Sequence, residues 1–250
     1  MTFPRGATFL TGLVALLAPV VIVSSIVALL GPWVAVVGLV ALLVPVVIVL
    51  GVVRLMLTPV FIQIEYRLPH FPADPYGFTR GDRLYWADVS RRFLLDSSPI
   101  SALAAQRLPN GQPLYNAREL RHMDDVKRVV QAALRVWYLA LALLALSAGA
   151  AWRWGLEDAY RRGLVYGGWL TVGLTLAVLV LAVVAFQTLF VDFHRVFFEG
   201  DTWLFAYHDT LIRLFPQRFW RDAFVLLAGL SAGLGRLLAF VLGGRGTGAF

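Results

Sequence analysis

The chain has 250 residues, of which 59% are hydrophobic and 15% are charged. With a mean hydropathy of +0.74 it is too apolar for a soluble domain, so the sequence predicts a membrane protein. Its net charge of +7 does not indicate a nucleic-acid partner, because the basic residues are scattered and form no clustered stripe. Cysteine is absent, which excludes disulfides, a thiolate nucleophile and cysteine metal ligands.

Five apolar runs are long enough to cross the roughly 30 Å hydrocarbon core of a bilayer. They cover residues 8–30, 33–57, 130–151, 164–187 and 222–243. The first two are separated only by Gly31-Pro32, a helix-breaking pair that favours a tight hairpin over one long helix. The sequence therefore predicts an all-α polytopic membrane protein with about five transmembrane helices. We divide it into an additional N-terminal transmembrane helix at 1–32 and a membrane domain at 33–250.

Arginines in the short polar segments indicate the orientation of these helices. Three arginines fall between residues 152 and 162, and the C-terminal tail carries Arg245. Both segments are predicted to be cytoplasmic by the preference of positive charges for that side. Counting back along the chain then places residues 58–129 and 188–221 on the outer face, together with the N-terminus.

The first outer segment has the pattern of packed helices. Thr79 and Asp82 have the spacing of a capping box. Apolar and charged residues then follow at helical spacing on opposite faces, the first set being Tyr85, Trp86, Val89 and Phe93 and the second Arg83, Asp88, Arg91 and Arg92. This pattern predicts an amphipathic helix within a small helical extracytoplasmic domain that lies on the membrane surface.

A second helix is predicted to run from water into lipid. Asn116 and Glu119 form an N-cap pair, and the helical pattern continues through His122 into the apolar run that begins near Val130. At about 1.5 Å per residue, His122 lies roughly 12 Å above the start of that run. Among the spans, the spacings Gly163 to Gly167 and Gly229 to Gly233 are typical of close helix packing.

Two histidines are candidates for acid–base chemistry near one face of the bilayer. Asp125 follows His122 by three residues on the same helical face, and a carboxylate beside an imidazole fixes its tautomer and raises its basicity. The structural alternative for Asp125 is an ordinary pair with an arginine. His194 follows an apolar span among several phenylalanines, where an ionisable group is costly and therefore informative.

Two further charged residues near His194 have both functional and structural interpretations. Asp201 could orient an imidazole or bind a substrate ammonium, or it could cap a turn. Arg213 could pair with Asp209, the expected N-cap of a short helix, or grip a phosphate or carbonyl. No Gly-x-Ser-x-Gly, His-Glu-x-x-His or Walker motif is present, so a hydrolase with its own nucleophile is disfavoured.

Several motifs around the two histidines resemble a bacterial family of small integral membrane proteins, the lipoprotein intramolecular transacylase (Lit) family. The motifs are Glu65-Tyr66, Asp74–Thr79, Asp82–Leu84, Glu119–Lys127, Phe193-His194, Phe197-Phe198, Asp201–Phe205 and Asp209–Pro216. Together they are fairly specific and cover about residues 33–243. Members of that family have four spans, so residues 8–30 are an addition here.

The resemblance implies a reaction, a location and a site. The sn-2 acyl chain of a diacylglyceryl-cysteine lipoprotein would move to the amine of the same cysteine, giving a lyso-form lipoprotein. His122 and His194 match the family's two functional histidines and would act as base and acid, in an order left open. Lys127 and Arg213 are candidates to stabilise the oxyanion, with Asp125 and Asp201 as supporting groups. The expected location is the bacterial cytoplasmic membrane, with the site at the outer leaflet.

We expect diacylglyceryl-modified lipoproteins and membrane phospholipids as partners, no nucleic acid, no cofactor and no metal. The main rival is a non-catalytic membrane protein that binds lipid or acts as a scaffold. It predicts that His122 and His194 lie far apart or face solvent, and a separation much above ~10 Å would exclude concerted acid–base catalysis. A metal site built from both histidines and an aspartate is a further alternative.

Overall fold

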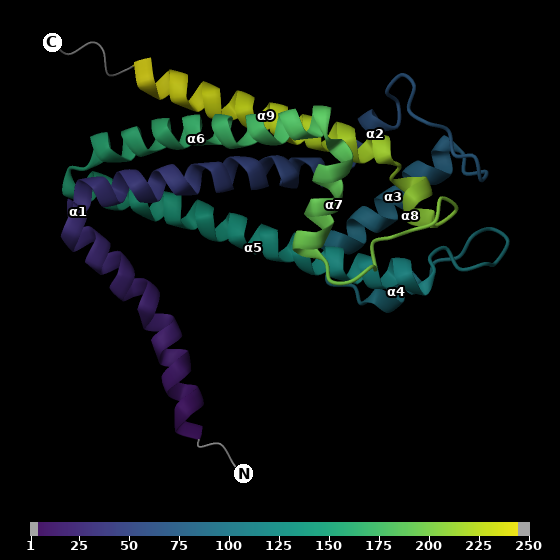
Figure 1. Ribbon diagram of the computed structural model, residues 1–250, viewed down its shortest axis with the longest axis horizontal. Helices are drawn as coiled ribbons and strands as arrows, with labels where there is room; N and C mark the ends of the chain where they lie inside the picture. The colour runs from purple at the N-terminus through teal and green to yellow at the C-terminus, as the bar shows by residue number, and fades with distance from the viewer. Residues whose placement is uncertain (1–4, 245–250) are drawn as a thin grey trace.

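The computed structural model describes residues 5–244, with side chains from residue 31 onward. Within this part of the chain the secondary structure is helical, apart from an isolated bridge between Arg107 and Pro113 (Figure 1). The helices are α1 (Arg5–Met56), α2 (Pro59–Glu65), α3 (Arg80–Leu95), α4 (Ile100–Ala104), α5 (Ala117–Trp154), α6 (Glu157–Val184), α7 (Phe186–Phe197), α8 (Thr210–Leu214) and α9 (Gln217–Gly243).

Four helical segments are long and apolar enough to cross a membrane: Gly31–Met56 of α1, α5, α6 and α9. They agree with the four later predicted spans except at one boundary. The predicted span 164–187 contains a break at Ala185, where α6 ends and α7 begins in a new direction. Hydropathy does not mark this break because the residues on both sides are apolar. The predicted span 8–30 lies outside the residues whose side chains are described.

Gly31 interrupts α1 with non-helical dihedral angles, φ 77° and ψ 155°. A side chain rarely adopts a positive φ, and Pro32 supplies no N–H for a continuous helix. The predicted break at Gly31-Pro32 is therefore confirmed.

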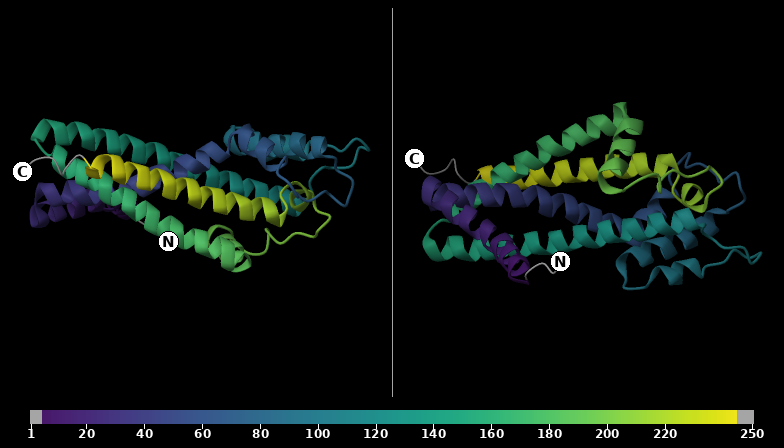
Figure 2. Two further views of the ribbon diagram at one scale, coloured as in Figure 1. Left: turned by 90° about the horizontal axis from the view of Figure 1, so that it is seen from above. Right: turned by 60° about the horizontal axis from the view of Figure 1, so that its bottom comes forward.

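Glycines on α6 allow it to pack closely between α1 and α9. Figure 2 shows the three helices running together in both views. A Cβ added at Gly163 would lie 2.6 Å from the Val40 Cβ, and one at Gly168 would lie 2.6 Å from the Gly235 carbonyl oxygen. The prediction for Gly229 and Gly233 was wrong, because neither has a neighbour within 4 Å of its Cβ position. The α9 glycine that makes the close contact is Gly235.

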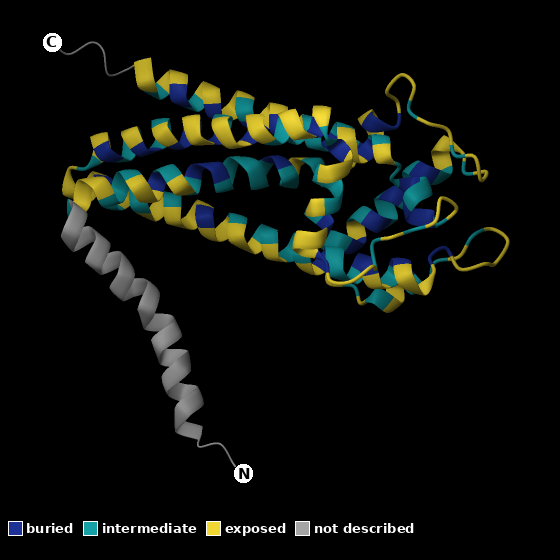
Figure 3. Ribbon diagram, viewed as in Figure 1, coloured by how far each residue is buried: buried dark blue, intermediate teal, exposed yellow. Residues whose placement is uncertain are grey.

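At one end of the bundle, α2, α3, α4 and α8 form a surface domain with its own core (Figure 1). The first turns of α5 complete it. Its buried apolar residues are Phe93, Leu103, Leu114, Tyr115, Met123, Leu211 and Leu214, with a second group of Ile62, Tyr66, Ala87 and Phe219. Figure 3 shows buried stretches on the helices of this domain, next to exposed loops and to the largely exposed faces of the long helices.

The capping box between Thr79 and Asp82 is confirmed, and the predicted apolar residues Trp86, Val89 and Phe93 pack in the core, but two other positions on α3 differ from the predicted amphipathic face. Arg83 is buried, whereas Tyr85 is 56% exposed. The Arg83 guanidinium donates to the Pro72 carbonyl oxygen at 2.6 Å and lies 4.9 Å from the ring centroid of Tyr66. This partnering offsets the cost of burying a charge, so Arg83 packs against the core.

The close approach of α6 and α9 predicts that Gly168→Ala will destabilise the bundle. The new methyl group must displace the backbone at Gly235, and overpacking of this kind costs about 1–3 kcal/mol. The matched control is Gly173→Ala on the same helix, where nothing lies within 4 Å and removing glycine favours the helix. Thermal unfolding in detergent, followed by circular dichroism, should show a lower midpoint for Gly168→Ala only. Equal midpoints for the two variants would contradict the packing.

Candidate active site

The side chains of His122 and His194 lie next to each other. Their ring centroids are 6.0 Å apart and their planes differ by 20°. His122 comes from α5 and His194 from α7, which leaves the end of α6 at a steep angle and runs toward the N-terminal part of α5 (Figure 1). Each histidine is 8% exposed, so the pair is neither separated nor facing solvent.

The cap of α5 positions His122. The Asn116 side chain accepts hydrogen bonds from the N–H groups of Arg118 and Glu119, and Glu119 Oε2 accepts from the Asn116 N–H at 2.8 Å. His122 follows one turn later. Charged residues continue along α5 to Arg128, and the apolar run begins after it. The helix has 38 residues and is about 57 Å long, which exceeds the thickness of about 30 Å of the hydrocarbon core. His122 therefore lies on the part of α5 outside the membrane-spanning segment.

Three polar contacts hold the segment that follows α7 against the start of α5. Glu119 Oε1 accepts from the Leu211 N–H at 2.7 Å, which joins α5 to the beginning of α8. The Asn116 amide donates to Asp209 at 2.9 Å. Arg118 donates to the Leu204 carbonyl oxygen at 2.9 Å. These contacts fix residues 198–209 beside the histidine pair.

Aromatic rings surround the two imidazoles. By centroid distance, Phe190 and Trp203 lie 4.2 and 4.9 Å from His194, Phe205 lies 5.3 Å from His122, and Phe198 lies 4.8 Å from His122 and 5.5 Å from His194. Such rings exclude water and lower the local dielectric constant. Electrostatic interactions and proton transfers inside the site are correspondingly stronger than in water.

The hydrogen bonds of the two imidazoles differ. His194 Nδ1 lies 2.7 Å from the Phe190 carbonyl oxygen, and a carbonyl only accepts, so Nδ1 carries the proton and Nε2 carries the lone pair. His122 Nδ1 is buried without a hydrogen-bond partner among the described residues. Burial lowers the pKa of His194, and burial together with the neighbouring His194 lowers the pKa of His122 to about 4. Both imidazoles are therefore neutral at neutral pH.

Asp125 and Lys127 are engaged elsewhere. The structure does not pair Asp125 with His122: the carboxylate lies 3.7 Å from Arg128 and is partly exposed, whereas His122 turns inward. The Lys127 ammonium donates to the Ser98 carbonyl oxygen at 2.6 Å and lies 4.0 Å from the centroid of the Phe93 ring. Lys127 therefore joins α5 to the end of α3, and its charge is not directed at the histidines.

In the described part of the chain, Asp201 and Arg213 likewise make their contacts away from both imidazoles. Asp201 is exposed in a turn, where its carbonyl oxygen accepts from the Leu204 N–H. Arg213 forms an ion pair at 3.0 Å with Asp74, not with Asp209, and lies over the Phe78 ring. The Asp74 side chain is fully buried. An ion pair between residues 139 apart in sequence therefore forms in place of the local pair that helical spacing predicts.

Trp203 and Thr202 are site residues to which the sequence analysis assigned no role. The Trp203 ring lies beside His194, and its Nε1 is buried without a hydrogen-bond partner among the described residues. Thr202 Oγ1 is also buried without a hydrogen-bond partner among the described residues. Both belong to the Asp201–Phe205 motif, which was the available signal, but spacing alone did not distinguish them from a turn.

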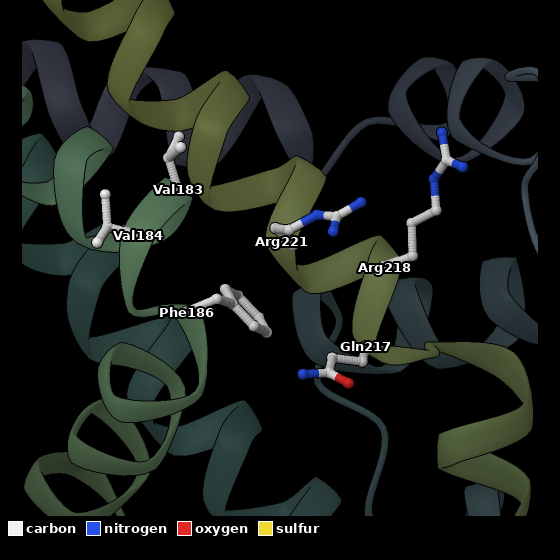
Figure 4. Close-up of a pocket in the computed structure, with 6 residues that line it drawn as sticks. All are labelled: Val183, Val184, Phe186, Gln217, Arg218 and Arg221. Atoms are coloured by element: carbon white, nitrogen blue, oxygen red, sulfur yellow. The ribbon is translucent and has the colours of Figure 1, made fainter.

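A pocket of about 400 Å³ lies where α6, α7 and α9 meet (Figure 4). Its lining combines apolar and polar side chains: Val183, Val184, Phe186, Gln217, Arg218 and Arg221. Phe186 contacts Phe190, which in turn contacts His194, so one face of α7 connects the pocket to the histidines. In the described part of the chain, no group of three or more potential protein ligands could hold a metal ion.

Comparison with known proteins agrees with this arrangement. The family model for lipoprotein intramolecular transacylase Lit matches residues 37–220. An uncharacterized protein of Aquifex aeolicus (strain VF5) is 30% identical over 186 residues, covering 72% of this chain and 80% of the relative.

The fold is that of solved Lit structures. The structure of Lit from Bacillus cereus is similar with a TM-score of 0.63 and 17% identity, covering 84% of this chain and 93% of that one. A Bacillus cereus variant with one histidine replaced by alanine gives a TM-score of 0.61 and 18% identity, with 83% and 90% covered. The chain belongs to the lipoprotein intramolecular transacylase Lit family of integral membrane proteins.

Proposed function

We propose that this protein moves the sn-2 acyl chain of a diacylglyceryl-cysteine lipoprotein to the α-amine of the same cysteine. The observation that carries the proposal is the His122–His194 pair, with ring centroids 6.0 Å apart inside an aromatic enclosure. Donor and acceptor belong to one molecule, so proximity supplies much of the rate and the protein needs no nucleophile. What remains for the protein is proton transfer and charge stabilisation.

His194 is the base in this mechanism. Its Nδ1 proton is committed to the Phe190 carbonyl oxygen, which leaves the lone pair of Nε2 to accept a proton. An α-amine has a pKa of about 7.7–8.0, so part of it is neutral at neutral pH; the neutral form attacks the ester carbonyl and loses one proton as it does so. The C–N bond forms, and the amine proton passes to His194.

His122 is the acid. As the ester C–O bond breaks, the departing glyceryl oxygen takes a proton from the His122 ring, while the extra proton on His194 passes to His122. Both imidazoles return to the neutral state, so no proton or electron is gained or lost overall. The aromatic rings around the pair keep out the water that would hydrolyse the ester.

The location and the lipid partners follow from the same proposal. The substrate amine and its acyl chains meet at the end of the bundle that carries the surface domain, which we place at the outer leaflet of the bacterial cytoplasmic membrane. Phospholipids are expected at the pocket beside α7, because Arg221 and Gln217 suit a headgroup and Val183 and Val184 suit an acyl chain. A non-catalytic scaffold would not require two buried, adjacent imidazoles.

His122→Ala and His194→Ala are each expected to abolish the lyso-form product, because either change removes one proton carrier. The protein would be expressed in a bacterium that lacks other N-acylating enzymes. Mass spectrometry of N-terminal lipopeptides would then detect transfer of the acyl chain. The matched control is His208→Ala, whose side chain is 72% exposed and which should leave the product unchanged. Unmodified diacylglyceryl peptides beside well-folded wild-type protein would refute the proposed activity.

His122 is expected to titrate near pH 4, because burial and the adjacent His194 disfavour its charged form. An ordinary histidine titrates near 6.5. Between these values the unfolded chain binds more protons than the folded one, so the free energy of unfolding should fall as the pH falls from 6.5 toward 4. NMR of histidine-labelled protein, assigned with His122→Ala, measures the titration. A midpoint of 6 or above would contradict a buried neutral imidazole.

A further inference from the structure

Buried polar atoms without partners gather around the histidine pair. Of the six such side-chain atoms in the described part of the chain, three are His122 Nδ1, Thr202 Oγ1 and Trp203 Nε1. Trp203 is in ring contact with His194, and Thr202 precedes it in the chain. The other three belong to Glu65, Arg83 and Ser231, which lie on α2, α3 and α9, whereas the imidazoles lie on α5 and α7.

The Trp203 indole N–H and the Thr202 hydroxyl can both donate to an acceptor that the described residues do not supply. An indole N–H can only donate, and a threonine hydroxyl can donate and accept. Leaving such a group buried and unpaired costs about 1–3 kcal/mol, so a substrate oxygen that accepts from it would remove that cost. The cationic groups expected from the sequence to meet a developing negative charge, Lys127 and Arg213, are instead bound to Asp96 and Asp74.

We infer that the Trp203 indole N–H, assisted by the Thr202 hydroxyl, donates hydrogen bonds to the ester carbonyl oxygen of the substrate. This inference rests on the proposed acyl transfer. Attack by the amine converts the carbonyl into a tetrahedral centre whose oxygen carries negative charge. The two donors stabilise that charge; when the C–O bond breaks, the oxygen reforms the C=O double bond and the bonding electrons leave with the glyceryl oxygen, which His122 protonates.

The backbone holds these donors in place before the substrate binds. Gly200, with φ 68°, turns the chain after α7, and the Leu204 N–H donates to the Asp201 carbonyl oxygen at 3.0 Å. Arg118 then fixes the Leu204 carbonyl oxygen at 2.9 Å from α5. Trp203 lies inside this double-anchored turn, so little reorganisation is needed when charge develops. Preorganised donors of this type account for large parts of the rate in acyl transfer.

Trp203→Phe tests the inference because it keeps an aromatic ring and removes only the N–H. We expect kcat for a synthetic diacylglyceryl-cysteine lipopeptide in detergent micelles to fall by about 10²-fold, as for the loss of one oxyanion donor, with KM changed far less. The thermal midpoint should not fall substantially, since the lost N–H has no partner in the free protein. Trp169→Phe, at a 53% exposed position on α6, is the control and should retain full kcat.

A second pair of variants keeps the test independent of the stability of Trp203→Phe. Thr202→Val should lower kcat, and Thr202→Ser, which keeps the hydroxyl, should restore most of it. Unchanged kcat in Trp203→Phe, or equal kcat in Thr202→Val and Thr202→Ser, would overturn the role of these donors while leaving the acyl transfer in place. An inactive wild-type protein would instead refute the proposed function itself.

Discussion

The geometry of the site depends on one buried carboxylate, that of Glu119. One of its oxygens closes the capping box of α5 through the Asn116 N–H, and the other accepts from the Leu211 N–H at the start of α8. Glu119 is 1% exposed, so water cannot readily replace either hydrogen bond and breaking one would be costly. Because α5 carries His122 and α8 ends the segment that carries Trp203, a single side chain sets the position of both sides of the site.

The enclosure of the histidines has an energetic cost that the surface domain offsets. Burying two imidazoles among aromatic rings favours their neutral forms and leaves one ring nitrogen without a partner. The cores formed by α2, α3, α4 and α8 supply the apolar burial that holds this region in place. Buried polar groups without partners lie where a substrate is expected to bind. Functional sites commonly have groups of this kind, which lower the stability of the free protein.

Local signals made much of this architecture predictable from the sequence. The capping boxes at Thr79 and Asn116 and the break at Gly31 depend on neighbouring residues, so spacing alone identified them. To predict that His122 and His194 lie close together required a count of membrane crossings and the family resemblance. The ion pair of Asp74 with Arg213 joins residues far apart in sequence, and the burial of Arg83 depends on the rings around it. No periodicity within one helix contains that information.

The break at Ala185 explains how the histidine that follows an apolar helix comes to lie beside α5. A continuous α6 would have carried His194 further along the axis of the bundle, away from α5. Instead α7 turns across toward α5 and presents Phe186, Phe190 and His194 at intervals of four residues along one face. Val184 and Val196 remain 78% and 76% exposed beside this face, as expected for contact with lipid. The turn at Ala185 therefore brings a histidine that follows an apolar helix to a buried position beside α5.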